Sequence, residues 1–276
     1  MSKVNMGNVK AVRVQAYGVT VGVDVESDRL AGILPERLRG VLPNDFSILP
    51  NQTKTDHLFQ IKKAKNNKFS LWKDDESIIA DCDEEMMLDR LDSQVRITIA
   101  EFAVGNVFVH SGVVAIEGKA IMIPASSYKG KTTLVAELVK NGAEYYSDEY
   151  AVLDKEGLVH PFAKDLSMRT PDGGGKQVDT PVEEFGGSAG KRAIPVGMVL
   201  VMEFKKYARW RPEILSRGQG VLEIISHTVP IRNDPAFSLT VLNKVVDNAV
   251  IVKSKRGEVS RFAKILIDYF TENVNT

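Results

Sequence analysis

A short segment, residues 121–133, carries the clearest chemical signal of the sequence. It runs Ile-Met-Ile-Pro-Ala-Ser-Ser-Tyr-Lys-Gly-Lys-Thr-Thr, an apolar strand followed by the pattern G-x-x-x-x-G-K-S/T with alanine at the first glycine position. In such a loop, backbone N–H groups and a helix N-terminus surround phosphates, a lysine reaches the terminal phosphates, and a hydroxyl binds Mg²⁺. The segment therefore predicts a nucleotide-phosphate site made by Ala125, Ser126, Ser127, Tyr128, Lys129, Gly130, Lys131, Thr132 and Thr133.

Polar residues at the ends of two predicted strands flank this segment. His110 precedes Lys131 by 21 positions (131 − 110), and Asp148, followed by Glu149, comes 17 positions after it (148 − 131). Phosphoryl transfer needs mainly alignment and charge neutralisation, so a lysine, a Mg²⁺ ion and a carboxylate aimed at the nucleophile form a minimal set. The three groups together predict a phosphotransfer site.

The elements around the loop support this interpretation. The strand before it, Lys119 to Ile123, is expected to pair with an antiparallel strand through a tight turn at Glu117-Gly118, because glycine accepts a positive φ. Leu134 and Leu138 face inward on a following helix that Asn141-Gly142 ends, and a strand starts at Glu144. Such a loop lies between a strand and a helix, as the motif requires.

The rest of the pattern predicts an α+β protein of two domains. Residues 1–104 form a β-rich lobe, with strands in Lys10 to Val25, His57 to Lys62, Phe69 to Lys73 and Ser77 to Asp81, that ends in a connector helix capped by Asp83. Residues 105–276 form the phosphate-loop domain. Its second half has an irregular stretch over 161–190, then strands at Val196 to Phe204 and Val250 to Lys253, and helices at Arg217 to His227, Pro235 to Asp247 and Glu258 to Thr271.

Composition excludes several classes of function. Lys plus Arg equals Asp plus Glu at 36 each, so no global field attracts nucleic acid or an anionic membrane. The single cysteine, Cys82, excludes an intramolecular disulfide and suits a reducing cytoplasm. The N-terminus opens no apolar signal segment, and no apolar run approaches the ~20 residues of a membrane span. We expect a cytoplasmic protein that contacts neither nucleic acid nor membrane.

From Val107 to Asp154, the order and separation of His110, Lys131 and Asp148 resemble the catalytic half of the HPr kinase/phosphorylase family, which is related in fold to the ATP-dependent phosphoenolpyruvate carboxykinases. Further on, the strand Val196 to Phe204, preceded by Arg192, is similar to the family's later strand with its phosphate-contacting arginine upstream. The resemblance implies a kinase with a mixed sheet flanked by helices, which binds ATP and Mg²⁺ and forms a homo-oligomer.

The resemblance also implies roles for single residues. Lys131 would bind the β- and γ-phosphates, Thr132 and Glu149 the metal, and Asp148 would take the proton of the acceptor hydroxyl as general base. His110 would hydrogen-bond Asp148 and tune its basicity. Lys164 and Arg169 follow the acidic pair closely enough to fold over the site, and the glycines of 172–175 favour a lid.

Three departures from the family pattern narrow the expected function. Ala125 replaces the first glycine, which fits if its φ is negative, and Glu149 replaces a second aspartate, which keeps the charge. The family's loop that recognises HPr is absent: residues 171–190 have a different sequence, so HPr is not the expected substrate and the reverse dephosphorylation is not expected either.

The leading hypothesis is therefore an ATP- and Mg²⁺-dependent kinase that phosphorylates a hydroxyl of a small molecule or a peptide serine. The alternative is a nucleotide-binding sensor or accessory protein without turnover, which the departures at Ala125 and Glu149 favour. A carboxykinase is disfavoured because the chain is short for that family and lacks a cluster of substrate-binding arginines.

Overall fold

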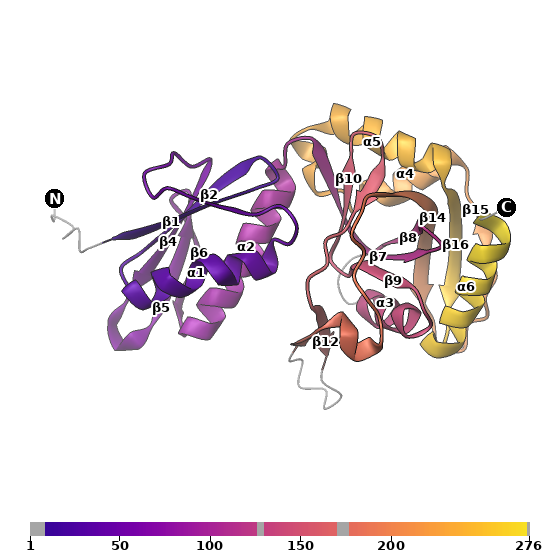
Figure 1. Cartoon of the computed structure of the whole chain (residues 1–276), viewed down its shortest axis with the longest axis horizontal. Helices are drawn as coiled ribbons and strands as arrows, with labels where there is room; N and C mark the ends of the chain where they lie inside the picture. The colour runs from indigo at the N-terminus through magenta and orange to yellow at the C-terminus, as the bar shows by residue number, and fades with distance from the viewer. Residues whose placement is uncertain (1–8, 126–129, 170–176, 275–276) are drawn as a thin grey trace. The chain divides into compact units, whose positions relative to one another are not determined.

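The computed structural model describes residues 9–125, 130–169 and 177–274. The chain divides into two compact units, Met1–Val104 and Gly105–Thr276. Each unit combines helices with a mixed sheet, which confirms the predicted α+β class (Figure 1). Within the described ranges, no helix is both long enough and apolar enough to cross a membrane.

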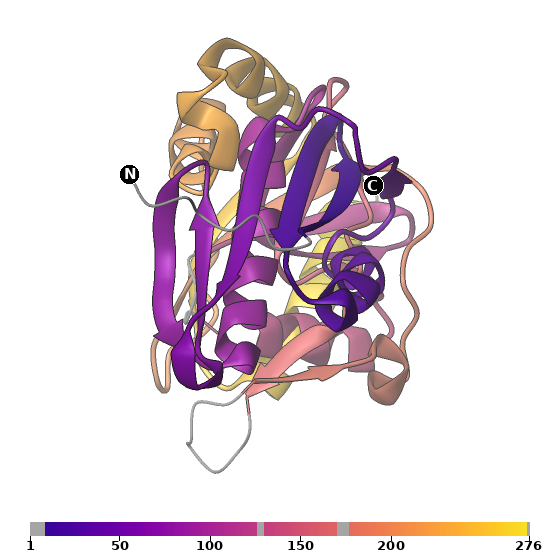
Figure 2. The ribbon, with the colours of Figure 1, turned by 90° about the vertical axis from the view of Figure 1, so that its left-hand side faces the viewer.

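The first unit is built on a six-stranded sheet of order β3-β1-β2-β4-β5-β6, whose strands lie side by side toward the viewer in Figure 2. Neighbouring strands are antiparallel except β2 and β4, which are parallel. The elements are β1 (Lys10–Ala16), β2 (Val19–Val25), α1 (Asp28–Val41), β3 (Ser47–Leu49), β4 (His57–Lys63), the 3₁₀ turn η1 (Lys65–Asn67), β5 (Phe69–Lys73), β6 (Glu76–Cys82) and α2 (Glu84–Phe102).

Helix α1 is missing from the sequence prediction, which treated this lobe as strands and loops. Its N-cap is Ser27, whose hydroxyl accepts a hydrogen bond from the backbone of Leu30. Pro35 lies inside it, a residue that usually ends a helix. Leu30, Leu34 and Leu38, spaced four residues apart, are buried and hold the helix against the sheet, so packing outweighs the local signal.

Helix α2 begins where the sequence predicts. Asp83 caps it by accepting a hydrogen bond from the backbone of Met86 at 2.8 Å. The apolar stripe is buried from Leu88 to Ile99, but Phe102, its last expected member, is 39% exposed. The helix ends two residues before the boundary between the two units.

The second unit holds an eight-stranded sheet of order β11-β10-β7-β8-β14-β16-β15, with β9 paired to β7. Its elements are β7 (Asn106–Ile116), β8 (Lys119–Pro124), α3 (Lys131–Lys140), β9 (Glu144–Ser147), β10 (Tyr150–Asp154), β11 (Leu158–His160), β12 (Leu166–Arg169), β13 (Gln177–Thr180), η2 (Val182–Phe185), β14 (Ile194–Phe204), β15 (Glu213–Ile214), α4 (Arg217–Ile225), η3 (Val229–Arg232), α5 (Pro235–Asn248), β16 (Val250–Arg256) and α6 (Val259–Val274). The stretch predicted as irregular thus contains two short strands and a 3₁₀ turn.

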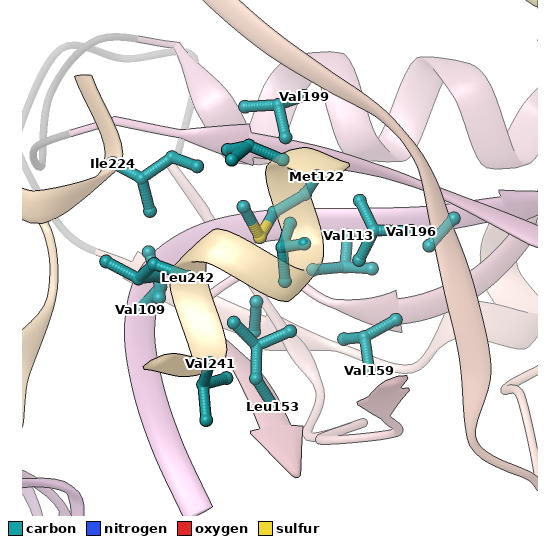
Figure 3. Packing of buried hydrophobic residues seen from close by; sticks show 14 of the residues in the cluster. Val109, Val113, Met122, Leu153, Val159, Val196, Val199, Ile224, Val241 and Leu242 are labelled. Atoms are coloured by element: carbon teal, nitrogen blue, oxygen red, sulfur yellow. The ribbon is translucent and has the colours of Figure 1, made fainter. Parts of the chain in front are cut away.

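Helices cover both faces of this sheet. On one face, Ile224 of α4 and Val241 and Leu242 of α5 pack against Val113 and Met122 of the sheet (Figure 3). On the other face, α3 and α6 pack through a second cluster that contains Leu134, Leu138, Phe262, Leu266 and Phe270. Nearly all of these side chains are fully buried, so the sheet is fixed from both sides.

The strand before the phosphate loop arrives from an antiparallel partner, as predicted. Strands β7 and β8 pair through a turn in which Glu117 (φ 50°) and Gly118 (φ 77°) are both left-handed. That partner, β7, is one continuous strand of 11 residues. On its other side β8 pairs in parallel with β14, which pairs in parallel with β16, so the carboxyl ends of β8, β14 and β16 meet at one edge.

Candidate active site

The start of helix α3 is built to leave backbone N–H groups available. Gly130 is its N-cap in the left-handed conformation (φ 77°), which favours glycine, and no side chain caps the helix. The first-turn N–H groups therefore keep the anion-binding capacity of a helix N-terminus. Ser126, Ser127, Tyr128 and Lys129, predicted to form the loop, lie outside the described residues.

Ala125 occupies its position without backbone strain. It is 5% exposed, its backbone N–H donates to the carbonyl oxygen of His110 at 3.3 Å, and its φ is not positive. An alanine side chain is therefore compatible with this backbone, and the missing glycine does not distort the end of β8.

Lys131 is a buried cation that lacks a hydrogen-bond partner in the described chain. Its side chain is 6% exposed, and Nζ makes no hydrogen bond to any residue that the structure describes. Burial lowers its pKa from 10.5 to about 8, although the nearby carboxylates of Glu149 and Asp148 act in the opposite direction. A buried ammonium without an acceptor is costly, and it fits an anionic ligand that supplies the acceptors.

Gly112 of β7 leaves room for the side chain of Lys131. A Cβ atom on Gly112 would lie 2.9 Å from Cγ of Lys131 and 2.7 Å from a methyl carbon of Val135. The lysine stem therefore passes over β7 where that strand has no side chain. Since β9 lies beyond β7, this path leads from α3 toward the acidic pair that follows β9.

Asp148 and Glu149 connect β9 to β10. The hydroxyl of Ser147 accepts the backbone N–H groups of Glu149 (3.0 Å) and Tyr150 (2.9 Å), which fixes the turn. The carbonyl oxygen of Glu149 also accepts from the backbone of Ser111 at 3.0 Å. The turn thus holds two carboxylates beside Lys131, with Glu149 the more exposed of the two.

Asp148 is 4% exposed and is oriented by two hydrogen-bond donors and one ion pair. Its Oδ1 accepts from the hydroxyl of Tyr145 at 3.2 Å, its Oδ2 accepts from the backbone of Ser167 at 3.3 Å, and Nζ of Lys164 lies 3.7 Å from Oδ1. Burial, then the charge of Asp148, raises the pKa of Tyr145, so this hydroxyl stays protonated and shares its one proton between the carbonyl oxygen of Lys164 (2.9 Å) and Oδ1 of Asp148. Lys164 thus does fold over the acidic pair.

His110 lies on β7 directly opposite Tyr150 of β10, with ring centroids 6.0 Å apart. Its backbone N–H donates to the carbonyl oxygen of His227 at 2.8 Å, which ties the end of helix α4 to the site strand. Burial, then the charge of Lys131, lowers the pKa of His227. No sequence pattern indicated that His227 would lie here, and the hydrogen bond expected between His110 and Asp148 stays a prediction.

The structure does not bring Arg192 to the phosphate loop. Its guanidinium lies beside Gly118, 3.7 Å from where a Cβ of that glycine would be, and its carbonyl oxygen accepts from the hydroxyl of Tyr146 at 3.0 Å. Gly118 is in the turn before β8, and the loop follows the other end of that strand, roughly 20 Å away at the usual rise per residue. The expected phosphate contact of Arg192 is therefore absent from this arrangement of the described residues.

Arg256, which sequence analysis overlooked, lies at the loop instead. It ends β16, is 5% exposed, and donates from Nη2 to the carbonyl oxygen of Gly130 at 3.1 Å. The predicted strand stopped at Lys253, three residues short of it. The signal that would have found it is topological, because only the parallel order of β8, β14 and β16 brings its end to the loop.

The other predicted residues fall into two groups. Thr132 and Thr133 lie in the first turn of α3, half-buried and exposed respectively, next to Lys131. The side chain of Arg169 and the glycines of the predicted lid, 172–175, lie outside what the structure describes. In the described part of the chain, no group of three or more His, Cys, Asp and Glu side chains is arranged to hold a metal, so a Mg²⁺ ion would need ligand oxygens from phosphate and water beside Thr132 and Glu149.

Comparisons with known proteins find similarity only to solved structures. No family model and no curated protein matches the chain. Among solved structures, the chain is similar to the HPr(Ser) kinase/phosphatase from Coxiella burnetii, with 14% sequence identity and a TM-score of 0.36, over 61% of this chain and 99% of that one. At that identity and TM-score, any assignment of chemistry rests on the site itself.

Proposed function

We propose that this protein is a cytoplasmic phosphotransferase that binds ATP and Mg²⁺ at the start of α3 and transfers the γ-phosphate to a hydroxyl group of a small molecule or of a peptide serine. The observation that carries the proposal is the buried ammonium of Lys131, which has no hydrogen-bond acceptor among the described residues and lies beside two carboxylates at a helix N-terminus that no described side chain caps. A terminal phosphate supplies the missing acceptors and negative charge.

Each residue then has a task. Lys131 and the N–H groups of α3 neutralise the phosphates, and Thr132 and Glu149 would hold a Mg²⁺ ion, which would neutralise further negative charge on the phosphates. Asp148 is held in one orientation by Tyr145 and Ser167, as a general base must be. It accepts the proton of the attacking hydroxyl while the oxygen forms its bond to the γ-phosphorus and ADP leaves.

Calorimetry with ATP and Mg²⁺, together with transfer of label from γ-radiolabelled ATP to a cell extract, tests the proposal. Lys131→Ala should abolish binding. Asp148→Asn should bind ATP as the unmodified protein does but lose roughly 10²- to 10⁴-fold in transfer, the usual contribution of a general base. Full transfer by Asp148→Asn would refute the proposed base, and binding without transfer by the unmodified chain would favour a sensor.

A further inference from the structure

The order of the strands determines the direction in which a nucleotide bound at the loop would extend. Asp148 and Glu149 follow β9, two strands from β8 across β7, whereas β14 and β16 lie on the other side of β8. A phosphate that transfers to a hydroxyl activated by Asp148 must face the β7 and β9 side of the loop. If the proposed function is right, the remainder of the nucleotide extends in the opposite direction, over the carboxyl ends of β14 and β16.

Arg256 occupies the middle of that route. Besides its bond to Gly130, it donates from Nη1 to the carbonyl oxygen of Gly257 at 3.3 Å and lies over the ring of Phe204 at 5.1 Å. Its Nε is buried without a partner among the described residues, and the carboxylate of Glu258 acts on it electrostatically but forms no ion pair with it. A buried guanidinium that bonds only neutral carbonyl oxygens retains charge for an anion.

A pocket of about 560 Å³ opens directly beyond Arg256. Its lining includes Gly257, the next residue, Arg209 and Trp210 of the segment after β14, and Arg261 and Phe262 of α6. Hydrogen bonds between Ser254 and the backbone of Arg211 tie the 205–212 segment to β16.

The chemistry of the pocket suits a nucleoside. The indole of Trp210 is held edge-on by Phe262 and Tyr269, with ring centroids 5.3 and 5.4 Å away. Arg209 and Arg261 are exposed and form no ion pair with any described residue. Aromatic rings and guanidinium planes stack on bases, and a carboxylate such as that of Glu258 accepts hydrogen bonds from ribose hydroxyls.

We propose that this pocket binds the base and ribose of the nucleotide, while Arg256 contacts the phosphate chain between the pocket and Lys131. The proposal rests on the proposed function, since it takes the phosphates to be held at Lys131. It adds a recognition site for the nucleoside part, which phosphate binding alone does not require.

Calorimetry with ATP and with inorganic tripolyphosphate, each with Mg²⁺, distinguishes the nucleoside pocket from the phosphate site, because tripolyphosphate has no nucleoside. Arg261→Ala should weaken ATP binding roughly tenfold, as expected for loss of a charged hydrogen bond, and leave tripolyphosphate binding unchanged. Lys264→Ala, an exposed lysine on the same helix outside the pocket, is the matched control and should alter neither.

Trp210 gives a second readout in protein that carries Trp72→Phe, because these are the two tryptophans of the chain. ATP should change its fluorescence, and tripolyphosphate should not. Equal affinity for the two ligands, both lost in Lys131→Ala, would overturn the nucleoside pocket and leave the phosphate site standing. Failure of the unmodified protein to bind either ligand would overturn the proposed function and this pocket with it.

Discussion

Replacing Lys131 by methionine should stabilise the ligand-free protein while it abolishes phosphate binding. In the folded chain the ammonium is buried and lacks a hydrogen-bond partner among the described residues, and its pKa falls from 10.5 to about 8. Each tenfold change in a protonation equilibrium corresponds to about 1.4 kcal/mol, so holding the charged form in this site costs about 3 kcal/mol. Methionine has a similar length and no charge, so it removes most of that cost.

The pH dependence of the stability difference tests whether burial of the charged Lys131 causes it. Below pH 8 the folded and unfolded chains both keep the proton on Lys131, and the unmodified protein carries the cost in full. Between pH 8 and 10.5 the unfolded chain binds more protons, so the stability of the unmodified protein rises with pH. The advantage of Lys131→Met should therefore fall from about 3 kcal/mol at pH 7 to under about 1 kcal/mol at pH 10.

Urea unfolding at both pH values, followed by Trp210 fluorescence in Trp72→Phe protein, reports on the unit that contains the site. Lys140→Met, an exposed lysine at the end of the same helix, is the control and should shift stability by no more than about 0.5 kcal/mol. A Lys131→Met protein that is less stable than the unmodified protein at pH 7, or equally favoured at pH 7 and pH 10, would refute the proposed cost of the buried charge.

Three further results are expected. Gly112→Ala should weaken ATP binding roughly tenfold because its Cβ meets the stem of Lys131, whereas Gly218→Ala, which meets open space, should leave affinity unchanged in calorimetry. Because bound phosphate favours the charged form of Lys131, ATP affinity should fall about tenfold for each pH unit above 8, and a flat titration would contradict this. Tyr145→Phe should lower the free energy of unfolding by about 1 kcal/mol and reduce transfer, since Asp148 loses a donor.

The parts of the site that are continuous in sequence were predictable. Gly118 indicates the hairpin, and a strand, a glycine and Lys131 in succession indicate a loop that opens a helix, because turn conformation and helix capping depend on neighbouring residues. The elements from Glu144 to the turn at Gly157 follow the same local rules. Helix α1 was not predicted because Pro35 usually indicates the end of a helix, whereas the buried leucines that stabilise this helix act through tertiary packing.

The positions of Arg192, which sequence reasoning misplaced, and Arg256, which it missed, depend on which strands become neighbours. Arg192 precedes β14 and Arg256 ends β16, and each is a basic residue beside an apolar run. A sequence does not state that β14 pairs in parallel with β8, or that β16 continues that order on the far side. Only this order decides that the start of β14 lies at the turn end of β8 while the end of β16 lies at the loop.

Under the proposed function, the same order assigns the two cationic groups to different parts of one nucleotide. Lys131 crosses β7 toward the carboxylates after β9, whereas Arg256 approaches Gly130 from the β14 and β16 side. Because these positions lie on opposite sides of β8, one anion at the loop can contact both groups only if it extends along the edge of the sheet. A chain of phosphates has that extended form and a single inorganic phosphate does not, so the proposed nucleotide would direct its reacting end toward Asp148 and its nucleoside end toward Arg256.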